Sequence, residues 1–159
     1  LAGQEDPSER VGRELRQRDL GRLLLLLRLG RRRREEQRQR EHELRTALRE
    51  IRGALDRFKL AGDQGLIERK AGDSGYPPDL ETLVRGVTNQ KSAAKERLVF
   101  LRRVPRDPFA PTDRTAAADT WGLRSYASPP DSPIEGADVF DVYSLSTGTG
   151  LDGTPYREW

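Results

Sequence analysis

In the first half of this chain the apolar residues recur with the spacing of a helix. In the second half they occur in short runs typical of extended backbone. Five apolar residues recur at alternating intervals of four and three, namely Leu44, Leu48, Ile51, Leu55 and Phe58. That spacing places all five on one face of an α-helix, and we call them the helix core stripe. Gly62 and Gly65 supply a stop signal after it. The pattern predicts a helix over roughly 36–61 whose stripe is buried against a sheet or another helix.

Turn residues and short apolar runs organise the next part of the chain. Residues 71–78 are rich in glycine and proline and predict a loop, after which Asp79 is placed to cap a short helix. The apolar run 98–101 is predicted to be buried. Pro105 and Pro108 exclude a regular helix around them, because proline restricts the residue before it to extended conformations.

Two later segments have the character of β-strands. Residues 121–126 alternate large apolar and polar side chains, and residues 138–145 combine β-branched and aromatic side chains. A proline-rich loop at 128–133 lies between them. Two strands connected in this way are predicted to pair in the antiparallel sense.

Charge divides the chain near residue 40. Residues 1–40 hold 12 Arg and 7 acidic residues, whereas residues 41–159 hold 17 basic and 19 acidic residues. The first 40 residues contain no aromatic side chain, and their apolar run at 23–27 is far shorter than the roughly 20 residues that span a bilayer. Residues 1–35 are therefore predicted to form a solvated or disordered arm, and residues 36–159 a folded domain.

Few residues have the pattern that catalysis or nucleotide binding requires. Cysteine is absent and His42 is the only histidine, which argues against a zinc site and a His-based triad. The run 148–153 matches G-x-G-x-x-G by letter, but that fingerprint needs a strand before it and a helix after it. The residues predict no enzyme. The alternative function is nucleic-acid binding through the basic arm at Arg31–Arg34, with an affinity that falls steeply with salt.

Five short motifs follow one another through residues 40–159. A helix ends before a Gly-rich loop, a Tyr-Pro pair precedes a short Leu-rich helix, and a basic-Pro-x-Asp-Pro segment comes next. An aromatic-Gly strand and an Asp-x-Tyr-Ser-Leu strand complete the order. The segments after the first helix are Tyr76-Pro77, 80–84, 103–108, Trp121-Gly122 and 141–145. In this order the chain resembles the major pseudopilins of type II secretion systems, the general secretion pathway protein G family of the type IV pilin-like superfamily.

The resemblance implies an α+β, pilin-like fold in which a long N-terminal α-helix packs on a small C-terminal antiparallel sheet. It implies a non-catalytic structural subunit that polymerises into the pseudopilus and drives export of folded proteins across the outer membrane. The implied partners are other copies, minor pseudopilins and the secretion machinery at the periplasmic face of the bacterial inner membrane, with no nucleic acid. The family's leader, Phe-Thr-Leu sequence and apolar helix have no counterpart in residues 1–40. Membrane contact is therefore expected only through a native N-terminal helix absent from this sequence.

The resemblance also implies a Ca²⁺ site in the loop after the Ser-Leu strand, built from carbonyl oxygens and two Asp side chains. The candidate ligands here are Leu145, Ser146 and Asp152. Gly148 stands where the family has an Asp, and a hard cation takes about six to eight oxygen ligands. We therefore expect Tyr156 and Trp159, rather than Ca²⁺, to close this loop by packing their rings on the sheet.

Overall fold

A computed structural model describes residues 7–114 and 116–159, with side chains from residue 20 onward. The first helix, α1, spans Pro7–Asp63, so its predicted start near residue 36 was wrong. Arg, Leu, Glu and Gln dominate the segment before residue 36, and these are strong helix formers. The chain divides into two units at the junction of Gln39 and Arg40, and each is described separately below.

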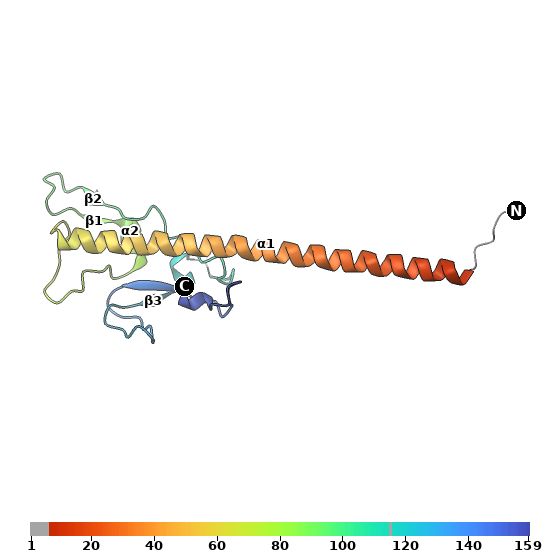
Figure 1. The fold of residues 1–159 in the computed structure, drawn as a ribbon. Coiled ribbons are helices and arrows are strands. Elements are labelled where there is room, and N and C mark those ends of the chain that lie inside the picture. Colours follow the sequence, from red (N-terminus) through yellow and green to blue (C-terminus); the bar gives the residue numbers. More distant parts are fainter. Residues whose placement is uncertain (1–6, 115) are drawn as a thin grey trace. The chain divides into compact units, whose positions relative to one another are not determined.

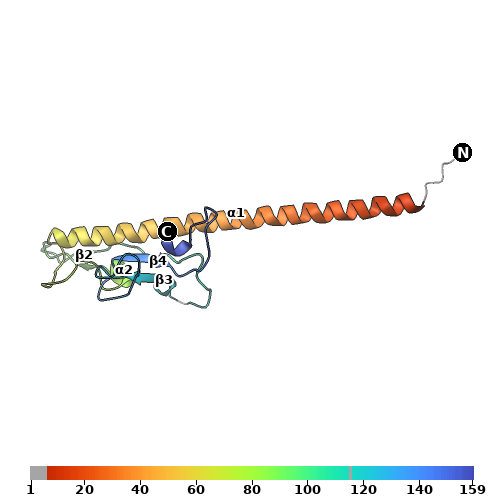
Figure 2. The ribbon, with the colours of Figure 1, turned by 60° about the horizontal axis from the view of Figure 1, so that its bottom comes forward.

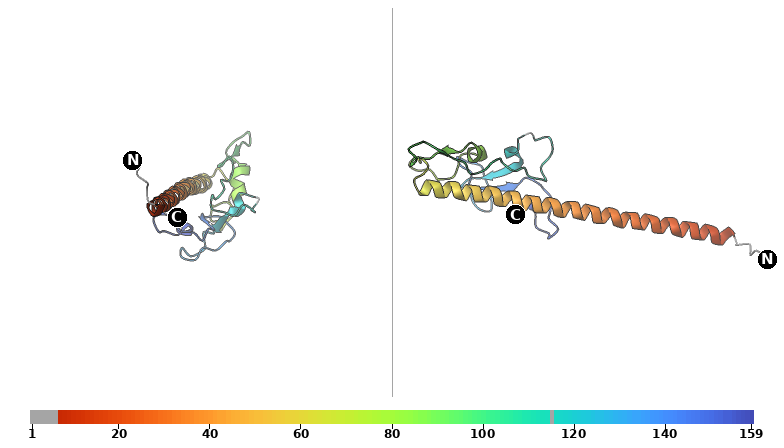
Figure 3. Two further views of the ribbon diagram at one scale, coloured as in Figure 1. Left: turned by 90° about the vertical axis from the view of Figure 1, so that its right-hand side faces the viewer. Right: turned by 90° about the horizontal axis from the view of Figure 1, so that it is seen from above.

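The unit 40–159 is α+β, with the C-terminal part of α1 as its longest element (Figure 1). Its other elements are α2 (Leu80–Arg85), β1 (Val87–Thr88), β2 (Arg97–Leu98), η1 (Ala118–Thr120), β3 (Trp121–Arg124), β4 (Asp141–Ser144) and η2 (Tyr156–Glu158). Seen along the helix, these elements lie to one side of the part of α1 that belongs to this unit (Figure 3, left). Strand β4 lies between α1 and β3 (Figure 2).

The short helix α2 has the cap that the sequence predicts. Oδ1 of Asp79 accepts a hydrogen bond of 2.7 Å from the backbone N–H of Thr82, and this satisfies an N–H of the first turn. The helix ends at Gly86, whose φ of 72° favours glycine. A Cβ on Gly86 would also lie 2.6 Å from the carbonyl oxygen of Leu98 on β2. Glycine is therefore required where α2 meets the β1–β2 pair.

Strands β3 and β4 pair in the antiparallel sense, as the sequence predicts, with Gly122 opposite Tyr143. The second pair, β1 with β2, is also antiparallel and was not predicted. The prediction that the whole run 98–101 is buried was partly wrong, because Leu101 is buried whereas Val99 is exposed. Residues in extended backbone alternate between two faces, so neighbouring side chains of this run point in opposite directions.

The helix core stripe is confirmed as the centre of the hydrophobic core, since none of its five side chains is more than 6% exposed. It packs with buried residues from α2, β3, β4, η2 and the segments that connect them. These are Leu80, Leu83, Leu101, Val104, Trp121, Val139, Val142 and Tyr156. Burying one such side chain stabilises the folded state by about 1.5–3 kcal/mol, so the stripe is the main attachment of α1 to the rest of the unit.

Candidate functional site

Two of the sequence motifs meet through a buried carboxylate. Asp107, from the Arg-Asp-Pro segment, is 1% exposed, and its Oδ2 accepts a hydrogen bond of 2.6 Å from the hydroxyl of Ser144 on β4. Its Oδ1 accepts a bond of 2.8 Å from the N–H of Phe109, a contact by which Asp107 forms a local turn. The Asp107 N–H donates to Oγ1 of Thr120 at 3.1 Å. Asp107 therefore joins the segment 103–108 to both β4 and η1.

The aromatic-Gly motif contacts two other motifs. The indole Nε1 of Trp121 donates a hydrogen bond of 2.8 Å to the carbonyl oxygen of Pro105. On the other side of the motif, the Tyr143 ring covers Gly122, and a Cβ on that glycine would lie 2.3 Å from Cζ of the ring. Only glycine leaves room for the ring of the cross-strand partner. This contact explains the pairing of Trp-Gly with Asp-x-Tyr.

The Tyr-Pro motif is attached to the segment that leads into β4. The N–H of Val139 donates a hydrogen bond of 2.7 Å to the carbonyl oxygen of Pro77. The ring of Tyr76 packs edge-on against Phe140, with centroids 5.0 Å apart. Tyr126 stacks on Tyr76 with centroids 6.0 Å apart. These contacts attach the Tyr-Pro motif to the residues just before β4 and to Tyr126, which lies two positions after the end of β3.

A second face of α1 holds the C-terminal loop, residues 145–159. Glu41, Arg45 and Arg52 lie on this face, and we call them the loop-binding residues. Their spacing of four and seven residues places them on one side of the helix. They were not predicted from the sequence, because charged residues on a helix usually form a solvated surface. The signal that would have found them is this regular spacing beside the helix core stripe.

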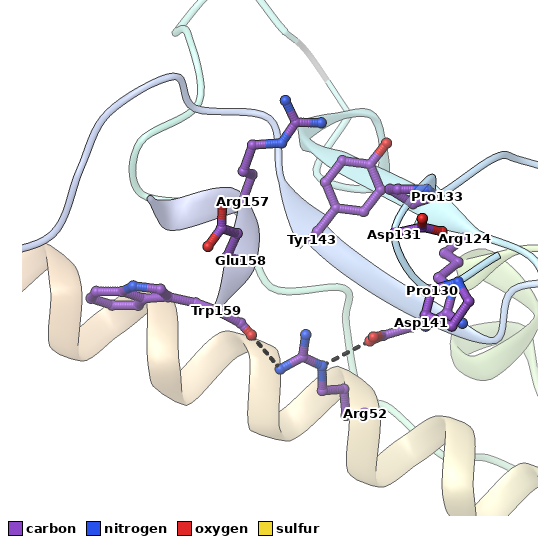
Figure 4. A pocket seen from close by; sticks show the side chains of 10 residues that line it. All are labelled: Arg52, Arg124, Pro130, Asp131, Pro133, Asp141, Tyr143, Arg157, Glu158 and Trp159. Atoms are coloured by element: carbon purple, nitrogen blue, oxygen red, sulfur yellow. Dashed lines mark hydrogen bonds and ion pairs between the residues drawn. The ribbon is translucent and has the colours of Figure 1, made fainter. Parts of the chain in front are cut away.

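Arg52 connects three parts of the structure through its guanidinium. Its Nε donates to Oδ1 of Asp141 at 2.8 Å, and its Nη1 donates to the carbonyl oxygen of Trp159 at 2.9 Å (Figure 4). Its Nη2 donates to the carbonyl oxygen of Val142 at 3.2 Å. The planar guanidinium fixes these acceptors relative to one another, which a lysine ammonium would do poorly.

Arg52 and Asp141 also line a pocket of about 620 Å³ between α1, β4 and the end of the chain (Figure 4). Arg124, Arg157, Asp131 and Glu158 are the other charged residues of its wall. Positive and negative side chains are equal in number here, so the pocket favours neither an anion nor a cation. Its wall contains the Arg52–Asp141 ion pair of 2.8 Å, which attaches β4 to α1.

Glu41 is a buried carboxylate that faces the C-terminal loop. Its side chain is 6% exposed, and its Oε1 accepts a hydrogen bond of 2.9 Å from the N–H of Leu151. The same oxygen accepts a bond of 3.0 Å from the hydroxyl of Tyr156. The Tyr156 ring stacks on Phe109, with centroids 4.1 Å apart. The predicted aromatic closure of the loop is therefore present, with Phe109 and α1 among its partners.

The three candidate Ca²⁺ ligands lie in different places. Leu145 and Ser146 line a pocket of about 320 Å³ together with Tyr143 and Arg157. Asp152 lines another pocket, of about 340 Å³, beside Arg45, Arg52 and Trp159. Within residues 20–114 and 116–159, no group of three or more His, Cys, Asp and Glu side chains is placed to hold a metal ion. A hard dication needs converging anionic oxygens, so these residues do not fit the Ca²⁺ site that the resemblance implies.

In the unit before residue 40, α1 exposes both leucine and arginine side chains. The leucines from Leu20 to Leu29 are all at least 45% exposed, and Arg31–Arg34 are exposed as well. Among the described residues, no helix combines the length and the apolar character that crossing a membrane requires. This part of α1 thus carries exposed apolar and basic side chains close together.

Comparisons with protein-family models, with curated proteins and with solved structures found no match for this chain.

Proposed function

We propose that this chain is a structural subunit of the type II secretion pseudopilus, with a pilin-like fold. In this role it polymerises with other copies and with minor pseudopilins at the periplasmic face of the bacterial inner membrane. The fibre then drives export of folded proteins across the outer membrane. The chain acts by assembly and performs no catalysis.

One observation carries the proposal: the motifs behind the resemblance contact one another and support a single arrangement. Asp107 of the Arg-Asp-Pro segment binds Ser144 of the Asp-x-Tyr-Ser-Leu strand. Trp121 binds the carbonyl oxygen of Pro105, and Tyr143 covers Gly122. Five weak motifs that occurred by chance would have no reason to be complementary in space. Their contacts hold a sheet on a helix, which is a structural task.

The surface of α1 offers a means of assembly. The helix core stripe and the loop-binding residues occupy two adjoining faces of the helix within the unit 40–159. The opposite side carries exposed charges of both signs, including Glu43, Glu50 and Arg57. In a repeating assembly, such charges meet their complements on the next copy only in certain registers. The interaction surface proposed for self-assembly is therefore this mixed-charge side of α1.

The test uses the bacterium that encodes the chain. Deleting its gene should leave exported proteins trapped in the periplasm, and the wild-type gene should restore their release. Unchanged release after deletion would contradict the proposed function. A complementing copy with Glu43→Arg and Glu50→Arg should fold but fail to restore release, because both positions are exposed and lie on the proposed assembly surface. The control is Asp131→Arg, an exposed position of the same unit that belongs to the loop 128–133 and not to α1.

Cross-linking gives a direct readout of assembly. The chain has no cysteine, so one introduced at Glu50 is a unique reactive group. In cells with the complete secretion machinery, a short bifunctional thiol reagent should yield cross-linked dimers of this variant, since each copy carries one thiol. Cells without the rest of the machinery should give monomers only. Monomers in both strains would argue against polymerisation through this side of α1.

A second candidate function follows from the exposed basic residues before residue 40. Arg31–Arg34 are all exposed on α1, and no acidic residue occurs from Leu20 to Arg34. Such a segment attracts the phosphates of nucleic acids. Binding of this kind would weaken by several orders of magnitude between about 50 and 200 mM salt if six or more phosphates were contacted. A salt titration with duplex DNA distinguishes the two functions.

A further inference from the structure

The C-terminal loop, residues 145–159, is closed by a cation that belongs to the chain. We propose that the guanidinium of Arg45 supplies the positive charge at Asp152 that a Ca²⁺ ion supplies in the family this chain resembles. The loop therefore reaches its folded state, and holds it, without a divalent metal. The inference rests on the proposed function only in naming the ion that is replaced. The contacts themselves are features of this chain.

The carboxylate of Asp152 is already bound on both oxygens. Its Oδ2 lies 3.2 Å from Nη2 of Arg45, and its Oδ1 accepts a hydrogen bond of 2.9 Å from the N–H of Thr154. A dication approaching this carboxylate would meet the guanidinium at close range, where like charges repel. Arg45 thus places a positive charge beside Asp152, and this charge opposes the approach of a metal ion.

The guanidinium of Arg45 is held in place by the end of the chain. Its Cζ lies 4.0 Å from the centroid of the Trp159 ring, within the range of a cation–π interaction. Trp159 is positioned in turn by the Tyr156 ring, whose centroid is 5.0 Å away, and by Arg52, which binds its carbonyl oxygen. One arginine therefore connects Asp152, near the middle of the loop, to its last residue.

The polarity of the loop also opposes a metal site. A Ca²⁺ loop directs oxygen atoms inward, at about 2.3–2.6 Å from the ion. Here the loop directs two donors, the N–H of Leu151 and the hydroxyl of Tyr156, toward α1, where both meet Oε1 of Glu41. The negative charge at the centre of this contact comes from the helix. The loop is thus built to bind a carboxylate of the chain.

Ser146, another candidate ligand, takes part in two local turns. The hydroxyl oxygen of Ser146 accepts a hydrogen bond of 3.2 Å from the N–H of Gly148. The N–H of Ser146 donates to Oγ of Ser144 at 3.2 Å. Leu145 and Ser146 line a different pocket from Asp152, so these residues do not converge on one point. The chain has replaced both the ion and the arrangement of ligands around it.

The test measures thermal unfolding of the full chain after dialysis against a chelator, with and without millimolar Ca²⁺. The wild-type midpoint should change by less than about 1 °C on adding Ca²⁺, since an ion with no site has no linkage to folding. Arg45→Gln should lower the midpoint by about 2–4 °C, because it removes both the ion pair and the cation–π contact. Asp152→Asn should have a smaller effect, and the double variant should be no less stable than Arg45→Gln alone.

The matched control is Arg49→Gln, one turn further along α1. Its guanidinium is exposed and contacts the hydroxyl of Thr46 at 3.4 Å, so its midpoint should equal that of the wild type. A Ca²⁺-induced rise of several degrees in the wild type, abolished by Asp152→Asn, would overturn the proposal. So would fully additive effects of Arg45→Gln and Asp152→Asn, since these would show no coupling between the two side chains. Both results concern the loop alone, and failure of secretion or cross-linking would instead contradict the proposed function.

Discussion

The hydroxyl of Ser144 donates a hydrogen bond of 2.6 Å to Oδ2 of Asp107, a residue 37 positions earlier in the chain. Both side chains are buried, so neither can replace this partner with water. The bond joins β4 to a segment that two prolines exclude from helix and that forms no strand. This contact thus helps to fix an irregular segment against the sheet.

Replacing Ser144 with alanine should therefore destabilise the protein. We expect Ser144→Ala to lower the free energy of unfolding by about 1–3 kcal/mol, because the buried Asp107 carboxylate loses a hydrogen bond that it cannot recover. Urea denaturation of the full chain measures this quantity. Ser132→Ala, at an exposed position, should change it by less than about 0.5 kcal/mol. Equal values for the two variants would mean that the Asp107 contact adds nothing to stability.

Shortening a side chain of the helix core stripe should also destabilise the protein. Leu48→Ala and Leu55→Ala should each lower the free energy of unfolding by about 2–4 kcal/mol, the usual cost of truncating a buried leucine. Leu60 lies on the same helix but is 55% exposed, so Leu60→Ala is the matched control and should cost less than about 0.5 kcal/mol. Chemical denaturation distinguishes these outcomes. A cost below about 0.5 kcal/mol for both stripe variants would contradict the packing of α1 on the rest of the unit.

Removing residues 1–35 should leave the fold of the remainder intact. The described leucines of this segment are exposed, and all the residues of the hydrophobic core lie at position 44 or later. Exposed side chains add little to stability, so the truncated and full chains should unfold at similar temperatures. Calorimetry or circular dichroism measures both midpoints. A drop of more than about 5 °C on truncation would show that this segment stabilises the domain.

The ring of Trp159 should contribute more to the stability of the C-terminal loop than the carboxylate of Asp152 does. Trp159→Ala should cost about 2 kcal/mol of unfolding free energy, since it removes contacts with Tyr156 and Arg45. Asp152→Ala should cost less than about 1 kcal/mol, because its ion pair with Arg45 is about half exposed and is screened by solvent. Both variants are compared by urea denaturation without metal. The reverse order would restore the carboxylate as the main anchor of the loop.

Acid should weaken the N-terminus of α2 through Asp79. Burial raises the pKa of this carboxyl, but hydrogen bonds from Thr82 and the charge of Arg85 outweigh burial and hold the pKa below its usual 3.8. The stabilisation is therefore complete above about pH 5 and is lost as the pH falls through the folded-state pKa. Asp79→Ser keeps a cap that does not titrate, so its stability should fall less between about pH 5 and pH 2.5. Parallel loss in both proteins would exclude Asp79 as a source of the acid sensitivity.

The local elements were largely predictable from the residues. The stripe from Leu44 to Phe58 predicted which side of the helix is buried, and Asp79 predicted the start of α2, because both signals arise within a few neighbouring residues. The paired strands β3 and β4 were found for the same reason. The start of α1 was missed because helix propensity alone, without an apolar stripe, sustains the helix before residue 36.

The contacts between distant segments depend on the tertiary structure. Nothing near Arg45 in the sequence indicates that it would meet Asp152 and Trp159, which follow more than a hundred residues later. The partners of a charged side chain depend on which segments folding brings within a few ångströms, and a one-dimensional pattern does not contain that distance. The sequence by itself determined the helix, its buried face and the strands. Only the packing of the C-terminal loop against α1 decided that a guanidinium and a glutamate, both from the helix, hold that loop.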